Sequence, residues 1–291
     1  MKKRKILFIS NPISGGRSKS GLRDVIKKQL WKERFKGEIT ETERPGHATE
    51  LAAGAVAAGF DSVVACGGDG TVNETAASLT GTDVKLGILP FGSGNGLARH
   101  LKIPLSIPQA LQRINRYRSK RIDAAYANEH VFFNVSGVGF DAFVGDAFSK
   151  TKSRGFYSYA RSVASSLRQY KPSRIEIQCP EGSFHDKAFI VSFANSSQYG
   201  NGACINPSGK INDGRIEICI LEPFPIFQAP HIMGLIFKQK IFKSSYFKSF
   251  SVKEAVIKCG KDGFLHIDGE PYPATDEIRL RVEQKALRVI V

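Results

Sequence analysis

The chain has 291 residues, with 42 Lys plus Arg against 27 Asp plus Glu, a formal net charge of +15 at pH 7 and a pI near 9.6. This length allows two domains of ordinary size, and the excess of positive charge favours an anionic partner such as nucleic acid, a membrane surface or a phosphorylated ligand. Five scattered cysteines without C-x-x-C spacing predict reduced thiols in a cytosol. The basic N-terminus lacks the apolar core of a signal peptide, and the longest apolar stretch is too interrupted to span a bilayer.

Strands and helices alternate in the first 123 residues. Buried strands are predicted at 5–10, 63–64 and 85–89, a further strand at 38–43, and helices at 22–30, 47–58 and 71–79. This order predicts a doubly wound parallel sheet, whose ligands bind at the carboxyl ends of the strands. The glycine-rich turns at 11–17, 67–71 and 90–99 are expected to lie together at that edge.

The second glycine-rich turn, which contains Asp69, predicts a nucleotide phosphate site. Its three glycines, Gly67, Gly68 and Gly70, can take positive φ and leave backbone N–H groups uncovered by any side chain, so that anionic oxygens can approach closely. Thr71 and Glu74 have the spacing of a capping box, so a helix is predicted to begin there with its positive end toward the loop. Asp69 would repel phosphates unless Mg²⁺ lies between them or Asp69 handles a proton. The alternative is a tight turn that Asp69 only caps.

Beyond residue 123 the pattern changes to alternation of apolar and polar residues, at 174–177, 187–193, 215–218 and 278–282. Such alternation is typical of antiparallel sheet with one solvated face. Helical patterns are confined to about 156–170 and 226–242. We therefore predict a β-rich sandwich domain at 124–291, with the active site in the cleft between it and an α/β nucleotide domain at 1–123.

The glycine-rich aspartate loop resembles a known family of kinases. The chain has no P-loop, no H-E-x-x-H and no protein-kinase H-R-D loop. The run Gly67-Gly68-Asp69-Gly70-Thr71 is similar to one shared by diacylglycerol-kinase-type lipid kinases, NAD kinases and, more loosely, phosphofructokinases. The rest of the chain resembles the lipid kinases, motif by motif and in order. An NAD-type kinase is the alternative. NAD kinases would be expected to carry a Thr-Gly-Ser-Thr-Ala-Tyr-like run in the later half, and the absence of this run favours a lipid kinase.

The resemblance implies that ATP is bound by the first domain. The implied nucleotide residues are Asn11, Pro12, Ser14, Gly15 and Gly16 in the first loop, Thr42, then Gly67, Gly68, Asp69, Gly70, Thr71 and Asn73, and finally Gly92, Ser93 and Asn95. Gly96 stands where many members of that family carry Asp, so a third carboxylate that is often linked to the metal network is missing. Ser93-Gly94-Asn95 also resembles sphingosine and ceramide kinases, so diacylglycerol and a sphingoid lipid both stay open.

The resemblance also implies catalytic and Mg²⁺-binding residues in the second half. Asp213, in Asn212-Asp213-Gly214, would bind Mg²⁺ with the backbone carbonyls of Lys210 and Arg215, and Asp123 would relay to the metal with Asp69. Glu270, after Asp268-Gly269, resembles the general base, so Asp69 and Glu270 are the implied catalytic residues. Asn134 and a predicted turn at Gly139-Phe140-Asp141 resemble the segment that opens the second domain in that family. From the residues alone, both Asp-Gly pairs are also favourable hairpin turns, which would leave Glu270 a solvated charge.

Two stretches, 238–250 and 150–157, interleave cations with aromatic residues. This pattern predicts a peripheral contact with the inner face of a cytoplasmic membrane, where a lipid substrate would lie. A soluble basic surface with core-facing aromatics is the alternative. No recognised nucleic-acid-binding module is present, which disfavours nucleic acid as the partner. A noncatalytic, membrane-associated nucleotide sensor and a homodimer both stay open.

Overall fold

The computed structural model describes residues 2–14, 21–149, 163, 165–167, 169–260, 265–273 and 276–291. The chain divides into two compact units, one of residues 1–122 with 285–291 and the other of residues 123–284. The first boundary lies within one residue of the predicted one, whereas the return of residues 285–291 to the first unit was not predicted. No helix in the described ranges is both long and apolar enough to cross a membrane.

The first unit is built on a parallel sheet, as predicted. Its strand order is β2-β1-β3-β4, and the C-terminal part of a long strand, β18, pairs in parallel with β4. Strands buried on both faces read as continuous apolar runs, and Ile6, Phe8 and Val64 are fully buried here. The bounds are β1 (Arg4–Ser10), β2 (Phe35–Glu41), β3 (Ser62–Gly67), β4 (Lys85–Pro90) and β18 (Glu277–Ile290).

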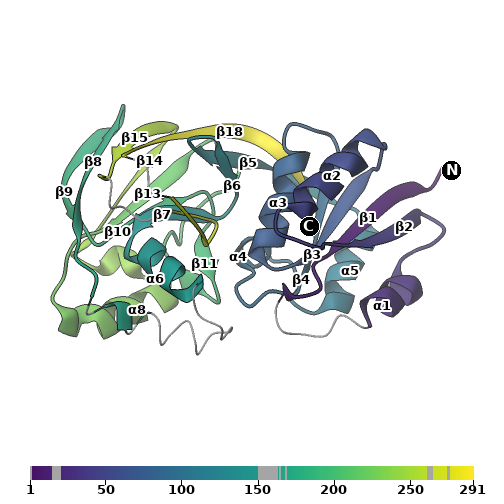
Figure 1. Ribbon diagram of the computed structural model, residues 1–291, viewed down its shortest axis with the longest axis horizontal. Coiled ribbons are helices and arrows are strands. Elements are labelled where there is room, and N and C mark those ends of the chain that lie inside the picture. The colour runs from purple at the N-terminus through teal and green to yellow at the C-terminus, as the bar shows by residue number, and fades with distance from the viewer. Residues whose placement is uncertain are drawn as a thin grey trace. The chain divides into compact units, whose positions relative to one another are not determined.

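Helices cover both faces of this sheet. The helices are α1 (Leu22–Gln29), α2 (His47–Ala57), α3 (Asp69–Leu79), α4 (Gly96–His100) and α5 (Ile107–Arg116). Helix α2 packs against α3 and α1 packs against α5, and the two pairs lie on opposite sides of the strands (Figure 1). Helix α5 was not predicted, although Pro108 in its first turn and the buried Ala110, Leu111 and Ile114 are typical of an amphipathic helix.

The predicted capping box at Thr71 and Glu74 is wrong. Helix α3 begins two residues earlier, at Asp69, and its N-cap residue Gly68 makes no side-chain capping bond. The Glu74 carboxylate instead accepts the N–H groups of Gly46, at 3.0 Å, and Ala48, at 3.2 Å. Glu74 therefore caps the positive end of the neighbouring helix α2.

We expect Glu74→Ala to lower the free energy of unfolding by about 2–3 kcal/mol, because two partly buried N–H groups lose their acceptor. Urea unfolding measures this change. Glu50→Ala is the matched control, since Glu50 lies on α2 and forms an exposed ion pair with Arg44, at 2.7 Å. The control should cost less than about 1 kcal/mol. Equal losses in the two variants would contradict the capping role.

The second unit consists mainly of antiparallel strands in two sheets, which confirms the predicted sandwich. One sheet has the order β18-β15-β8-β9, in which the first part of β18 pairs with β15. Strand β5 also pairs with β18, and β6 pairs with β5. The other sheet has the order β14-β13-β10-β7-β16-β17. A shared core contains residues from both sheets, including Ile177, Phe193 and Ile257.

The strands of this unit have the bounds β5 (Ser119–Ala127), β6 (His130–Phe132), β7 (Val135–Gly139), β8 (Ser173–Cys179), β9 (Gly182–Ala188), β10 (Ile190–Ala194), β11 (Gln198–Gly200), β12 (Ala203–Cys204), β13 (Ile216–Leu221), β14 (Phe247–Val252), β15 (Glu254–Lys258), β16 (Leu265–Ile267) and β17 (Glu270–Tyr272). Strands β11 and β12 form a separate two-stranded sheet.

Helices in the second unit pack on a second core, which includes Phe189, Ile232 and Ile236. They are α6 (Phe140–Ser149) and α8 (Ala229–Phe237), with short 3₁₀ turns η2 (Ile226–Gln228) and η3 (Ile241–Lys243) on either side of α8. The helical pattern at 226–242 is thus confirmed, and the one at 156–170 lies mostly outside the described residues. The predicted turn at Gly139-Phe140-Asp141 is wrong: Gly139 ends β7 and Phe140 begins α6.

Candidate functional site

The three glycine-rich loops meet at one edge of the parallel sheet, as predicted. Ser10 is paired with Cys66, and Gly67 with Pro90, so β1, β3 and β4 end side by side. The Asn11 amide nitrogen donates to the Thr71 hydroxyl at 3.2 Å, which ties the first loop to the second. Gly15 and Gly16 lie outside the described residues.

The glycines at this edge are required for their small size, and Gly67, Gly68 and Gly70 do not use the positive φ that glycine allows. Positive φ occurs at nine other glycines of the described chain but not at Gly67, Gly68 or Gly70. A Cβ atom on Gly92 would lie 2.6 Å from the Cα atom of Gly68. The N–H groups of Phe91 and Gly92 also donate to the Gly67 carbonyl, at 2.9 and 3.2 Å. The second and third loops therefore touch backbone to backbone, which a larger residue would prevent.

Asp69 fixes the third loop to the start of α3. Its two carboxylate oxygens accept the N–H groups of Asn95 and Gly96, each at 2.8 Å. Asn95 has a left-handed backbone, with φ of 51°, and its side-chain amide donates to the Gly92 carbonyl at 2.6 Å. Asp69 is thus a capping residue for α4. Its predicted role in metal binding or proton handling stays a prediction.

The other predicted nucleotide residues lie around the same loops. Thr42 is buried, and its N–H donates to the Ser10 carbonyl at 2.9 Å, which places Thr42 beside the end of β1. The Ser14 hydroxyl donates to the Asn11 carbonyl at 3.2 Å. Pro12 and Ser93 are exposed, and Asn73 is half-buried on α3. The predicted nucleotide residues thus come from the connections after β1, β2, β3 and β4, which lie at one edge of the sheet.

The predicted metal turn lies in the second unit, just before β13. The exposed Asp213 accepts the N–H of Arg215 at 3.2 Å through one carboxylate oxygen. The fully buried Asp123 accepts the N–H of Gly214 at 2.6 Å, so the structure brings Asp123 against this turn. Lys210 is exposed.

The donor set at this turn is one carboxylate with backbone carbonyls. Hard oxygen ligands of this kind suit Mg²⁺. Across the described residues, no group of three or more His, Cys, Asp or Glu side chains is arranged to hold a metal ion. A metal here would therefore depend on the carbonyl groups of Lys210 and Arg215, and that role stays a prediction.

Glu270 follows a tight hairpin turn. Strands β16 and β17 pair Ile267 with Glu270, and the two turn residues have positive φ, 48° at Asp268 and 91° at Gly269. This geometry is favourable for Asp-Gly, so the hairpin interpretation is confirmed. The Asp268 carboxylate accepts the N–H groups of Phe133 and Asn134, at 3.0 and 2.9 Å. The anchored turn presents the Glu270 side chain to solvent.

A buried polar network, which the sequence analysis missed, is hydrogen-bonded to the turn of this hairpin. The His266 Nδ1 atom accepts the N–H of Gly269 at 3.2 Å, so a neutral ring carries its proton on Nε2. Nε2 lies 3.1 Å from an Asp141 carboxylate oxygen, to which the Tyr199 hydroxyl also donates, at 2.9 Å. Burial and the negative charge of Asp141 hold the pKa of Tyr199 well above its usual value. The Ser192 hydroxyl completes the network with Tyr199.

We expect His266→Phe to lower the free energy of unfolding by about 2–4 kcal/mol, because Gly269 loses its acceptor and the buried Asp141 loses a donor. Urea denaturation followed by circular dichroism measures the loss. His185→Phe, on the exposed side of β9, is the control and should stay within about 0.5 kcal/mol of the wild type. If His266→Phe leaves the free energy of unfolding unchanged, the network does not hold the hairpin.

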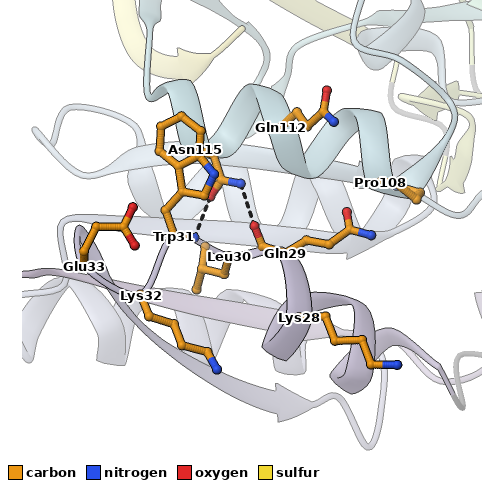
Figure 2. Close-up of a pocket in the computed structure, with 9 residues that line it drawn as sticks. All are labelled: Lys28, Gln29, Leu30, Trp31, Lys32, Glu33, Pro108, Gln112 and Asn115. Carbon is orange, nitrogen blue, oxygen red and sulfur yellow. Dashed lines mark hydrogen bonds between the residues drawn. The ribbon is translucent and has the colours of Figure 1, made fainter.

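A surface hollow of about 620 Å³ lies on the first unit, between residues 28–33 and helix α5 (Figure 2). It adjoins the start of β2, so it lies at the opposite edge of the sheet from the glycine loops. At its wall the buried Asn115 accepts the N–H of Trp31, at 3.1 Å, and donates to the Gln29 carbonyl, at 2.8 Å. These bonds join α5 to the α1–β2 connection, and the hollow contains none of the predicted site residues.

Two family comparisons agree with the two units. Residues 5–127 match the family described as Diacylglycerol kinase catalytic domain, and residues 134–291 match the YegS C-terminal NAD kinase beta sandwich-like domain. The chain is 30% identical over 268 residues to a Diacylglycerol kinase of Staphylococcus saprophyticus, a match that covers 90% of this chain and 88% of the relative. It is 29% identical over 284 residues to a Probable lipid kinase YegS-like of Pectobacterium atrosepticum, which covers 95% and 92%.

Solved structures share the fold. A diacylglycerol kinase from Bacillus anthracis str. Sterne has a TM-score of 0.76 at 22% identity and covers 100% of this chain and 97% of its own. An NAD kinase from Archaeoglobus fulgidus, solved in complex with ATP, has a TM-score of 0.53 at 11% identity and covers 99% and 93%. The family matches at both ends of the chain and the relatives of nearly equal length show that the protein belongs to the family of diacylglycerol kinases and YegS-like lipid kinases.

Proposed function

We propose that this family member is an ATP- and Mg²⁺-dependent lipid kinase, which transfers the γ-phosphoryl group of ATP to the hydroxyl of a lipid alcohol such as diacylglycerol or a sphingoid lipid. The observation that carries this proposal is the gathering of three glycine-rich loops at one sheet edge, with Asp69 holding the third loop onto α3. Such an edge is where parallel sheets bind their ligands.

The phosphate groups of ATP would lie against the loops after β1, β3 and β4. The first turn of α3 offers N–H groups at the positive end of its helix dipole, which favour an anion. Gly68 and Gly92 place no side chain at the contact between the second and third loops, and both residues are half-buried. In this proposal Asn11 and Thr42 flank the nucleotide.

Mg²⁺, when bound, would neutralise charge on the phosphates during the transfer. The residues suited to hold a divalent cation are Asp213 and the carbonyls of Lys210 and Arg215. The buried Asp123 would keep that turn in place through the N–H of Gly214. We propose that Glu270 accepts the proton of the lipid hydroxyl, since it is an exposed carboxylate on a hairpin that Asp268 anchors.

The direct test is transfer of radiolabel from [γ-³²P]ATP to a total lipid extract, with identification of the labelled species. We expect label in a phosphorylated lipid alcohol and none without Mg²⁺. A parallel aqueous reaction with NAD separates an NAD-type kinase, because label in NAD alone would refute the lipid proposal. Vesicle binding without any consumption of ATP would instead indicate a noncatalytic nucleotide sensor. We further propose that the protein works in the cytoplasm, at the inner face of the membrane.

A further inference from the structure

Exposed apolar side chains are concentrated in one segment of the second unit. Eight large hydrophobic side chains are exposed in the described part of the chain, and five of them lie within residues 226–242. The five, with their exposed fractions, are Ile226 (58%), Phe227 (74%), Met233 (39%), Phe237 (43%) and Phe242 (60%). We call this set the α8 face. Exposed apolar groups that are concentrated in one segment mark an interaction site more often than isolated ones do.

Helix α8 is apolar on more than its core side. Ile232 and Ile236 are buried in the second core, whereas Met233 and Phe237, one residue further along, point outward with the same spacing of four. The nine residues of α8 include no Asp, Glu, Lys or Arg. A helix that is apolar on both sides needs an apolar environment for its outer side as well.

The charged residues within the segment that carries the α8 face all have one sign, although Lys248 is paired with Glu222, just before this segment, at 2.6 Å. From residue 223 to residue 253 the sequence contains five lysines and no Asp or Glu. Lys238, Lys240 and Lys243 directly follow α8 and are all exposed. An anionic bilayer complements both features, because its acyl chains accept the apolar groups and its headgroups attract the lysines. A second copy of the chain would bring like charges together across a symmetric contact.

Most aromatic side chains of the stretch predicted to contact a membrane, residues 238–250, are not exposed, and the membrane contact itself stays a prediction. Of the four aromatic residues in this stretch only Phe242 is exposed. Tyr246 and Phe247 pack against the second core, and Phe250 packs against the core between the sheets. The exposed aromatic groups lie earlier in the chain, on η2 and α8. The other predicted stretch, 150–157, lies outside the described residues.

We propose that the α8 face is the part of the protein that inserts into the surface of an anionic membrane. Phe227 and Phe237 lie at the boundary between headgroups and acyl chains, and Lys238, Lys240 and Lys243 contact the anionic headgroups. The insertion gives the enzyme access to an acceptor that resides in the bilayer, and in this respect it rests on the proposed lipid kinase function. The binding itself does not depend on catalysis.

The test is sedimentation of the protein with vesicles of phosphatidylcholine that contain 30% phosphatidylglycerol. We expect Phe227→Ser with Phe237→Ser to weaken vesicle binding about tenfold or more, since each ring loses a buried apolar surface. The triple variant Lys238→Gln, Lys240→Gln, Lys243→Gln should also lose about tenfold, and wild-type binding should fall at high salt. The matched controls are Leu105→Ser, and Lys27→Gln with Lys28→Gln and Lys32→Gln, all exposed in the first unit, and they should bind as the wild type does.

A second measurement separates this proposal from the kinase function. Each variant is assayed with a short-chain, water-soluble lipid alcohol, and retained activity there shows that the variant is folded. If the variants of the α8 face bind vesicles as well as the wild type does, the proposal is overturned, whether or not the protein phosphorylates lipids. Unchanged vesicle binding together with loss of a wild-type dimer in light scattering would also overturn it, in favour of a second copy. Vesicle binding that depends on the α8 face, without any lipid phosphorylation, would support the surface and refute only the kinase function.

Discussion

Glu270→Gln is expected to lower the rate of lipid phosphorylation by about 10²- to 10⁴-fold, which is the usual contribution of a general base. Gln keeps the size and polarity of the side chain but cannot accept the proton of a hydroxyl group. Glu270 is exposed at the start of β17, so the exchange leaves the packing of the second unit intact. The rate is measured with saturating radiolabelled ATP, and the affinity for ATP, measured by calorimetry, should stay unchanged.

Glu254→Gln is the control for this variant. Glu254 is an exposed carboxylate at the start of β15, in the same unit as Glu270, and has no proposed role in catalysis. We expect its turnover to equal that of the wild type. Full activity in Glu270→Gln would remove Glu270 from the mechanism and would leave it a solvated charge at a hairpin.

Asp69→Asn is expected both to weaken ATP binding and to lower the free energy of unfolding by about 2–4 kcal/mol. The carboxylate accepts two backbone N–H groups, those of Asn95 and Gly96. The amide of Asn can accept only one of them and turns its own NH₂ group toward the other, which leaves a donor without an acceptor. The third loop should then lose its fixed position. Urea unfolding without Mg²⁺ measures the structural part of the effect, and ATP titration measures the functional part.

The control for this experiment is Asp24→Asn, because Asp24 is an exposed carboxylate in the first turn of α1. It should cost at most about 1 kcal/mol, through the helix dipole. If Asp69→Asn is as stable as the wild type without Mg²⁺ but inactive, the loop-holding role described here is wrong and the carboxylate acts only on the metal or on a proton.

The parallel sheet and its three loops could be predicted from the sequence because the signals are local. Strands buried on both faces appear as short apolar runs, such as Ile6 to Ile9, and glycine-rich turns mark their ends. Once the strands are taken as parallel, their carboxyl ends share an edge, and the loops follow from topology alone. Helix α5 carried a local signal too, from Pro108 and the spacing of Ala110, Leu111 and Ile114.

The partners of the acidic residues could not be predicted in the same way. Asp69 and Glu74 each bind backbone N–H groups that lie 26 to 28 residues away along the chain. Propensity and spacing describe only the local segment, so Glu74 looked like a cap for its own helix. The need for glycine at Gly68 and Gly92 likewise arises from contact between two loops and not from the φ values of either one.

The network of Asp141, Tyr199 and His266 shows the same limit more strongly. Asp141 and His266 are 125 residues apart and meet because β7 pairs with β16, with His266 opposite Gly137. In the sequence each is a single polar residue between apolar neighbours, and nothing in its own segment indicates its partner. Only the register of the two strands makes their contact evident.

Strand β18 has a consequence for the order in which the protein is made. Its C-terminal part pairs with β4, yet residues 285–291 are synthesised only after the whole of the second unit. Until β18 is synthesised, β4 is an unpaired edge strand of the first unit's sheet, and an unpaired edge is prone to pair with other chains. A single cut between residues 122 and 123 would therefore not release an intact first unit, because residues 285–291, which close its sheet, remain on the other fragment.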